Sequence, residues 1–180
     1  MFRTLTALTV SIMIMSASAS AQPQIYIPPF VSDNSGEIKG PVMLSGLEEH
    51  IEVIGFEHEI SSSADMASGL PTGKRQHKPL TIVKELDEAS PLLADTMTRN
   101  GGIDEIEFRF YRPSSQGARQ HYFTITLNDA QISGIRHEMG PGALSPLYEY
   151  ISFTYAKIIW EHETEGTTAM ATSQPTRRRM

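Results

Sequence analysis

Two segments of the chain place a histidine between two glutamates, residue types that can bind a metal ion. They are Glu57–Glu59, centred on His58, and Glu161–Glu163, centred on His162. On a β-strand, neighbouring residues point to opposite faces, so these glutamates cannot easily join their histidine in one site. The chain also lacks the His-Glu-x-x-His pattern of zinc hydrolases. We therefore expect half-exposed strand positions and no metal site, and a metal-dependent hydrolase is the weakest of three candidate functions.

A glycine-rich segment, Gly69–Arg75, resembles a phosphate-binding loop at first sight. Its glycines are one residue too close together, and Arg75 stands where a serine or threonine must bind Mg²⁺. Pro71 also removes one backbone donor that would contact a phosphate. No serine has the Gly-x-Ser-x-Gly setting of a hydrolase nucleophile, and the acidic residues are scattered. The sequence therefore predicts no catalytic residue and no cofactor, and we do not expect an enzyme.

Length and composition favour one acidic globular domain. The 180 residues suit a single domain whose core needs no disulfide or metal, and the chain contains no cysteine. The net charge of −6 argues against a nucleic-acid partner, which would require a basic face. The one basic cluster, Arg177–Arg179, follows a stretch rich in threonine and serine. We expect residues 167–180 to form a disordered basic tail.

The first 21 residues are predicted to be a signal peptide. Arg3 is followed by an apolar stretch, Leu5–Met15, and then by the small residues Ala19-Ser20-Ala21. This order of a positive, an apolar and a small-residue region is typical of export signals. The apolar stretch is shorter than the roughly 20 residues that a membrane-spanning helix needs. An N-terminal anchor and a misassigned start codon are the alternatives.

Hydrophobic alternation predicts mostly short strands. Ile106–Arg112 and His121–Leu127 alternate apolar and polar residues around a short turn, so we expect them to form a hairpin. Within residues 51–60 the alternation changes phase at Gly55, which predicts a bulge or a bend. Further strands are expected at 24–27, 42–47, 77–84, 131–135 and 148–160. A turn at Asn128-Asp129 is expected to precede the strand at 131–135. The last strand has apolar residues on both faces.

One helix and one long loop complete the pattern. Ser90 is the expected N-cap of the helix, Pro91 its first residue, and the Asn-Gly-Gly of 100–102 its end. The helix is about ten residues long, which is too short for stability in isolation, so it must pack on a sheet. Ser61–Gln76 is rich in serine and glycine and is predicted to be a loop. Loops of such length are usually functional or disordered.

These elements predict a mainly β fold, a compact β-barrel of two packed sheets with one short α-helix on its flank. Many short strands must bury their apolar faces against one another, which favours this architecture. The expected organisation is a signal peptide at 1–21, a β-barrel domain at 22–166 and the basic tail at 167–180.

Several separated blocks of the sequence resemble the Hcp family, the tube proteins of bacterial type VI secretion systems. The blocks are Gly55–Glu59, His77–Leu93, Phe110–Arg112, Tyr122–Leu127 and Ile158–His162. They match the family in order and spacing, and the resemblance extends from about Ile25 to Gly166. It implies a compact β-barrel with a flanking helix that assembles into homohexameric rings.

The resemblance also implies a function and partners. The rings of this family stack into an inner tube, which a contractile sheath drives outward beneath a spike protein, and small effectors travel in the ring channel. The expected partners are therefore other copies of the chain, the spike, the sheath and effector cargo. The family's extended loop corresponds to residues 61–76. The expected ring-contact or stacking residues there are Ser63, Asp65, Met66, Gly69, Leu70, Pro71, Gly73 and Lys74.

The N-terminal pattern departs from the family, whose tube proteins are loaded from the cytoplasm without a cleavable signal. Three explanations follow: the true start lies downstream, the protein uses the general export route, or a diverged relative kept the ring and lost the tube. The expected location is extracellular, through the periplasm if the signal is used, and cytoplasmic before tube assembly if the start is misassigned. The alternative function is an exported periplasmic or extracellular β-barrel binding module that keeps the Hcp fold without tube function.

Overall fold

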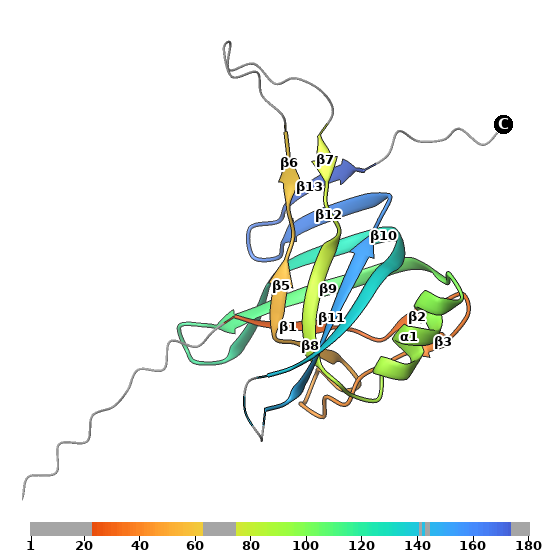
Figure 1. Ribbon diagram of the computed structural model, residues 1–180. Coiled ribbons are helices and arrows are strands. Elements are labelled where there is room, and N and C mark those ends of the chain that lie inside the picture. The colour runs from red at the N-terminus through yellow and green to blue at the C-terminus, as the bar shows by residue number, and fades with distance from the viewer. Residues whose placement is uncertain (1–22, 63–74, 141, 143–144, 174–180) are drawn as a thin grey trace, which may run out of the picture.

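Alternating apolar residues form the strands of one large, rolled β-sheet with a helix beside it (Figure 1). The computed structural model describes residues 23–62, 75–140, 142 and 145–173. The strands are β1 (Gln24–Ile27), β2 (Phe30–Ser32), β3 (Gly36–Ile38), β4 (Ile51–Val53), β5 (Gly55–Glu57), β6 (Ile60–Ser61), β7 (Gln76–His77), β8 (Leu80–Glu85), β9 (Gly102–Pro113), β10 (Arg119–Met139), β11 (Leu147–Thr154), β12 (Lys157–His162) and β13 (Thr167–Thr172). Helix α1 spans Ser90–Thr98. In the described ranges no helix has the length and apolar character needed to cross a membrane.

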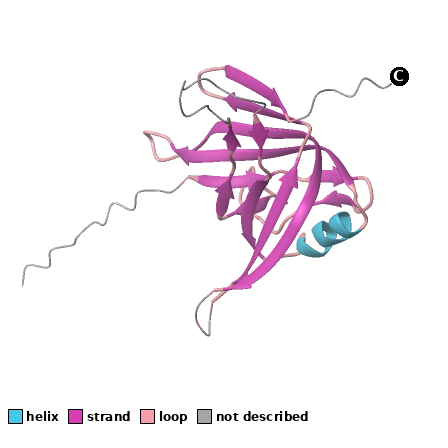
Figure 2. Ribbon diagram, turned by 45° about the horizontal axis from the view of Figure 1, so that its top comes forward, coloured by secondary structure: helices cyan, strands magenta, loops and turns pink. Residues whose placement is uncertain are grey.

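The main sheet has the order β4-β1-β9-β10-β11-β8-β5, with β12 paired to β10 and β13 to β12. β4 and β5 lie at opposite ends of this order but are separated in the chain only by Ile54. The sheet therefore rolls round until its two ends meet at this corner, and Figure 2 shows α1 outside the roll. The predicted bend is confirmed, because the chain bends at Ile54 between β4 and β5. A side chain at Gly55 would meet Val83 at 2.9 Å. The predicted mainly β class with one flanking helix is confirmed as well.

β10 is a long, bent strand against which much of the sheet is built. The sequence predicts two strands separated by a turn at Asn128-Asp129, and that prediction is wrong because β10 runs unbroken from Arg119 to Met139. Asp129 has a left-handed backbone conformation, with φ of 49°, and the pairing with β11 shifts in register between Ile132 and Gly134. The chain therefore bends at this point while it stays in the sheet.

The bend in β10 divides the strand that runs beside it. The sequence predicts one strand over 148–160, but β11 and β12 are separated by Tyr155 and Ala156. Both strands pair with β10, and the amide of Ala156 donates to the carbonyl oxygen of Asn128 at the bend. On their other sides, β11 pairs with β8 and β12 pairs with β13, so the sheet splits here. No glycine or proline within 148–160 signals this break.

The ends of helix α1 differ in detail from the prediction. Its N-cap is Ala89 and not Ser90, so that assignment is wrong. The hydroxyl of Ser90 accepts a hydrogen bond from the amide of Asp87 at 3.1 Å and takes part in a buried network described below. The helix ends where expected, and Asn100, with φ of 54°, takes the left-handed conformation that ends many helices.

The domain extends beyond its predicted boundary at residue 166. Thr167–Thr172 form β13, which pairs with the whole of β12, so the prediction of a disordered tail is wrong for these residues. The open edge of β12 supplies backbone partners, and the β-branched threonines of β13 favour an extended chain. Ser173 continues the contact, because its amide donates to the carbonyl oxygen of Ala156 at 2.8 Å. The basic cluster Arg177–Arg179 lies outside the described residues, as does the predicted signal peptide at 1–21.

The hydrophobic core lies inside the rolled sheet. Leu80 and Ile82 from β8 face Phe108 from β9 and the pair Ile151 and Phe153 from β11, and all five side chains are at most 1% exposed. Burying each such side chain stabilises the fold by about 1.5–3 kcal/mol. The core is therefore built from alternate residues of neighbouring strands, as the sequence alternation predicts.

Candidate functional site

The residues expected to contact a neighbouring ring lie outside the described part of the chain. They are Ser63, Asp65, Met66, Gly69, Leu70, Pro71, Gly73 and Lys74. The structure describes the base of this segment, where β6 and β7 pair in antiparallel fashion with Ile60 opposite His77. The two ends of the predicted loop 61–76 are therefore strand residues that lie side by side (Figure 1).

At this base, His58 takes part in a hydrogen-bonded group that we call the His–Tyr cluster (His58, His77 and Tyr155). Nε2 of His58 lies 2.6 Å from Oη of Tyr155, and Nδ1 of His77 lies 3.1 Å from the same oxygen. Tyr155 has one hydroxyl proton, so it donates to one ring and accepts from the N–H of the other. Glu59 faces elsewhere and forms an ion pair with Lys78 at 2.7 Å.

Burial sets the protonation of the His–Tyr cluster. It lowers the pKa of His58, and the nearby charge of His77 lowers the pKa of His58 further. Burial also raises the pKa of Tyr155 to about 12. His58 and Tyr155 are therefore both neutral at pH 7, which is the state in which one hydroxyl can join two imidazoles. The cluster links the chain on both sides of the long segment to the break between β11 and β12.

The second histidine between glutamates has separate partners. Nδ1 of His162 lies 3.1 Å from Oγ1 of Thr164 and accepts a hydrogen bond from the amide of Glu165 at 3.2 Å. These contacts belong to the turn between β12 and β13. Across the described ranges, the structure contains no group of three or more histidine, aspartate or glutamate side chains arranged to hold a metal ion.

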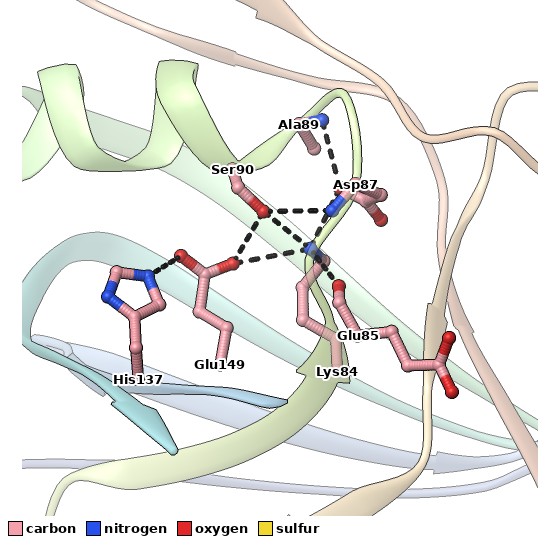
Figure 3. Close-up of polar contacts among 7 residues, drawn as sticks. All are labelled: Lys84, Glu85, Asp87, Ala89, Ser90, His137 and Glu149. Carbon is pink, nitrogen blue, oxygen red and sulfur yellow. Dashed lines mark hydrogen bonds and ion pairs between the residues drawn. The ribbon is translucent and has the colours of Figure 1, made fainter. Parts of the chain in front are cut away.

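A buried ion pair, which the sequence analysis missed, joins β8 to β11 (Figure 3). Lys84 and Glu149 stand directly opposite each other in register, both are fully buried, and Nζ lies 3.2 Å from Oε2. Nζ of Lys84 also donates to Oδ1 of Asp87 at 2.8 Å. The hydroxyl of Ser90 donates to Oε2 of Glu149 at 2.8 Å. This arrangement fixes the turn between β8 and α1 against the sheet.

His137 extends the group to a third strand, and we call the whole set the Lys84 network (Lys84, Asp87, Ser90, His137 and Glu149). His137 on β10 is the direct neighbour of Glu149 on β11, and its Nε2 donates to Oε1 at 3.1 Å. A buried ion pair is tolerated only where further hydrogen bonds satisfy its charges, and this network supplies them. Its residues make structural contacts, and no nucleophile with an activating base is present among them.

Strand alternation contains the signal that would have revealed the pair. Lys84 has the same parity as Leu80 and Ile82, and all three are buried. Glu149 has the same parity as Ile151, whose side chain is also buried. A lysine and a glutamate at core positions of neighbouring strands therefore indicate a buried pair, because a lone buried charge would be too costly.

A groove of ≈ 530 Å³ opens beside the turn that the Lys84 network fixes, and we call it the acidic groove. It is lined by Pro41, Val42, Met43, Leu44, Glu52, Ile54, Glu85, Leu86 and Asp87. Met43 is 87% exposed and Ile54 52% exposed, although both are large and apolar. Exposed apolar groups rimmed by polar ones are typical of protein-contact surfaces. The strand predicted over 42–47 is wrong, because these residues form loop and turn instead.

The fold and its surface define a class of protein. Its polar clusters connect strands to one another, and four of its exposed apolar residues, Met43, Leu44, Ile54 and Leu86, line a groove. Such a molecule is a β-scaffold with surfaces suited to protein contact.

The sequence places this scaffold in a known family. Residues 31–162 match the family described as "Type VI secretion system effector, Hcp". The chain therefore belongs to the Hcp family, and the resemblance expected from its sequence blocks is confirmed.

Individual relatives agree with this assignment. The "Major exported protein" of Pseudomonas aeruginosa is 39% identical over 158 residues, which cover 85% of this chain and 90% of that protein. A crystal structure of an Hcp protein superposes with a TM-score of 0.78 at 27% identity, covering 84% of this chain and 99% of the other. The secreted protein Hcp3 from Pseudomonas aeruginosa gives a TM-score of 0.69 at 31% identity, with coverage of 83% and 99%.

Proposed function

We propose that this chain is the tube subunit of a type VI secretion system. Copies of it assemble into hexameric rings, and the rings stack into the inner tube. The observation that carries this proposal is the match to Hcp proteins over nearly the whole domain, in sequence across residues 31–162 and in fold at a TM-score of 0.78. Because the match is not confined to one segment, it favours the family's structural role over a borrowed fold fragment.

The surface of the described domain supports self-association. Val31, Met139 and Met170 are each more than 60% exposed, and they belong to different strands of the molecule. A ring uses two different surfaces of each subunit, which meet head to tail until rotation closes the circle. Each contact must offset the loss of translational and rotational freedom on association, so apolar residues of this kind are expected in it.

The segment at 63–74 is proposed as the contact to a neighbouring subunit or ring. The support for this comes from its base, where the β6–β7 pair and the His–Tyr cluster hold the two ends of the segment together. A segment anchored in this way can present side chains at a defined place beyond the sheet. Spike protein, contractile sheath and effector cargo in the channel are the further partners of this proposal.

We also propose that the protein acts outside the cell. The 39% identical relative is named as an exported protein, and a structural relative is named as a secreted one. The N-terminal pattern of residues 1–21 suggests a second possible route, through the general export pathway and the periplasm. That pattern is the observation that favours the alternative, an exported binding module with the Hcp fold and no tube function. Neither function assigns a catalytic step or a cofactor.

The first experiment is negative-stain electron microscopy of the purified chain, combined with its particle mass in solution. The tube-subunit proposal expects rings with sixfold symmetry, an open centre and six times the mass of one chain. A single species with the mass of one chain, at concentrations up to the millimolar range, would contradict the proposal and favour the binding module. The same preparation tests stacking, because stacked rings appear as short rods in side view.

A further inference from the structure

We infer that the acidic groove binds the arginine-rich segment 174–180 of a second copy of this chain. The groove combines two chemistries in one place. Glu52 and Glu85 are exposed carboxylates on its wall, and within the described residues neither has an ion-pair partner and no basic side chain lines the groove. Its apolar surface is supplied by Met43, Ile54 and Leu86, whose side chains are exposed.

An arginine-containing peptide fits this combination. The guanidinium group forms paired hydrogen bonds with a carboxylate, and the aliphatic stem of arginine packs on apolar surface. The segment Gln174–Met180 carries Arg177, Arg178 and Arg179 in succession and ends in a methionine. It contains no acidic side chain, so the charge carried by its side chains is opposite to that of the groove.

The position of the groove argues for a second copy and against the chain's own segment. Ser173, from which the segment leaves, is hydrogen-bonded to the carbonyl oxygens of Tyr155 and Ala156, just past the end of β11. The groove lies at the other end of β11, where the carbonyl oxygen of Leu147 accepts from the amide of Leu86. Figure 1 shows β13 and the turn after β8 at opposite ends of the molecule.

The reach of the chain can be compared with this separation. The extended chain from Leu147 to Tyr155 spans roughly 26 Å, at about 3.3 Å per residue. The backbone from Ser173 spans at most about 14 Å to Arg177 and at most about 22 Å to Arg179, at about 3.6 Å per residue. The backbone of all three arginines therefore falls short of the groove of the same chain, whereas the segment can enter the groove of a neighbour. A contact between opposite ends of two identical chains is head to tail, and it can repeat along an assembly.

The Lys84 network prepares the groove for this contact. The Lys84 side chain is fully buried, and its Nζ donates a hydrogen bond to Oδ1 of Asp87 at 2.8 Å. Asp87 is therefore fixed from the interior of the domain. The same Nζ donates to the carbonyl oxygen of Glu85 at 2.7 Å. The backbone that presents Glu85 and Leu86 is therefore held in place before a partner arrives, which reduces the ordering cost of binding.

The test is a binding titration with a fluorescent peptide of residues Ala171–Met180. The receptor is the purified chain with Arg177→Gln, Arg178→Gln and Arg179→Gln, so that its own segments do not compete. We expect saturable binding that weakens as salt rises, because the contact is charged. When the receptor also carries Glu52→Gln and Glu85→Gln, its affinity for the peptide should fall at least ~10-fold, because charge-assisted hydrogen bonds are lost. The matched control is Glu57→Gln with Asp104→Asn, two exposed carboxylates outside the groove, which should leave binding unchanged.

A charge exchange guards against loss of binding through misfolding. The receptor with Glu52→Lys and Glu85→Lys should reject the native peptide and bind a peptide in which the three arginines are replaced by glutamates. Equal binding to the groove variant and the control variant would overturn the inference, as would equal binding of a peptide with the three arginines changed to glutamine. A contact between the segment and the groove of the unmodified chain that does not depend on protein concentration would show that the contact is within one chain and would overturn the second-copy assignment. The titration does not require rings, so its failure is distinct from failure of the tube-subunit proposal, in which the sixfold rings themselves are absent.

Discussion

Glu149 shows how a charged residue is accommodated in the core of this fold. Its carboxylate is fully buried and accepts hydrogen bonds from Lys84, Ser90 and His137, which come from β8, α1 and β10. Removing one member of a buried pair leaves the other charge without compensation, and this costs far more than the pair itself contributes. The turn between β8 and α1 is therefore held by this carboxylate together with that of Asp87.

The variant Glu149→Ala tests this dependence. We expect it to lower the free energy of unfolding by about 3 kcal/mol, because buried Lys84 keeps only Asp87 as a counter-charge, and Ser90 and His137 lose their acceptor. Urea denaturation followed by tryptophan fluorescence measures the change. The control is Glu138→Ala, whose carboxylate pairs with Arg136 at the surface and should cost at most ~1 kcal/mol. If the two variants lose similar amounts of unfolding free energy, the buried pair stabilises the fold no more than a surface pair does. The double variant Lys84→Met with Glu149→Leu should recover most of the loss.

The His–Tyr cluster predicts a dependence of stability on pH. The pKa of His58 is lowered in the folded protein, mainly by burial, so the folded state binds a proton less readily than the unfolded chain, where the pKa is 6.5. The stability that neutral His58 contributes is therefore fully present above pH 6.5 and is lost as pH falls below it. Denaturant midpoints measured between pH 8 and pH 5 should decrease on acidification. The decrease should be smaller in His58→Gln. In His162→Gln, which removes a ring that has no contact with the His–Tyr cluster and is hydrogen-bonded within its own turn, it should match that of the unmodified chain. A decrease that is identical in all three proteins would refute the assignment to His58.

At the scale of elements, alternation predicts well where a strand has one buried face. Ile106–Arg112 and His121–Leu127 lie within β9 and β10, and they pair as expected. The phase change at Gly55 is enough to predict the corner between β4 and β5, because a glycine is needed where Val83 approaches so closely. Local patterns fail where tertiary contacts decide. The break at Tyr155 follows from a bend in a different strand.

The same limit applies to the candidate site. Ser90 has the sequence context of an N-cap, yet its hydroxyl bonds to Glu149, which is 59 residues away. Competition of this kind cannot be read from neighbours in the sequence. The acidic groove was missed for a similar reason, because the segment 41–44 and the turn after β8 meet only in the folded chain.

β13 is the element whose contribution is most directly testable. Truncation after Gly166 removes this strand and exposes the edge of β12, including the backbone of Ile158 and Trp160. Hydrogen exchange of the β12 amides that pair with β13 should accelerate, because their acceptors are lost, whereas exchange in β8 should change little. Truncation after Ser173, which keeps β13, is the matched control and should leave protection intact. Unchanged protection after the shorter truncation would show that β13 does not stabilise the sheet.

For the whole molecule, the interior and the surface have separate tasks. The Lys84 network and the core hold a rigid roll of strands, and the exposed apolar residues and the acidic groove are left at its surface. A rigid unit with such surfaces suits repeated assembly, because each contact is formed with little further ordering of the chain. A tube subunit does not need the N-terminal pattern of residues 1–21. The route by which the protein leaves the cell therefore decides between a tube subunit and an exported binding module.

Export of the protein therefore separates the two functions. If the chain is a tube subunit, deleting the contractile sheath from the producing cell should remove it from the medium while its amount inside the cell is maintained. A secreted protein with an ordinary signal peptide serves as the control and should still reach the medium. Immunoblots of the cytoplasmic, periplasmic and extracellular fractions provide the measurement. If the chain still appears in the medium or periplasm of sheath-less cells, and has lost residues 1–21, then export uses the general pathway. The scaffold would then serve as an exported binding module, because a subunit removed singly through that pathway cannot enter a tube assembled in the cytoplasm.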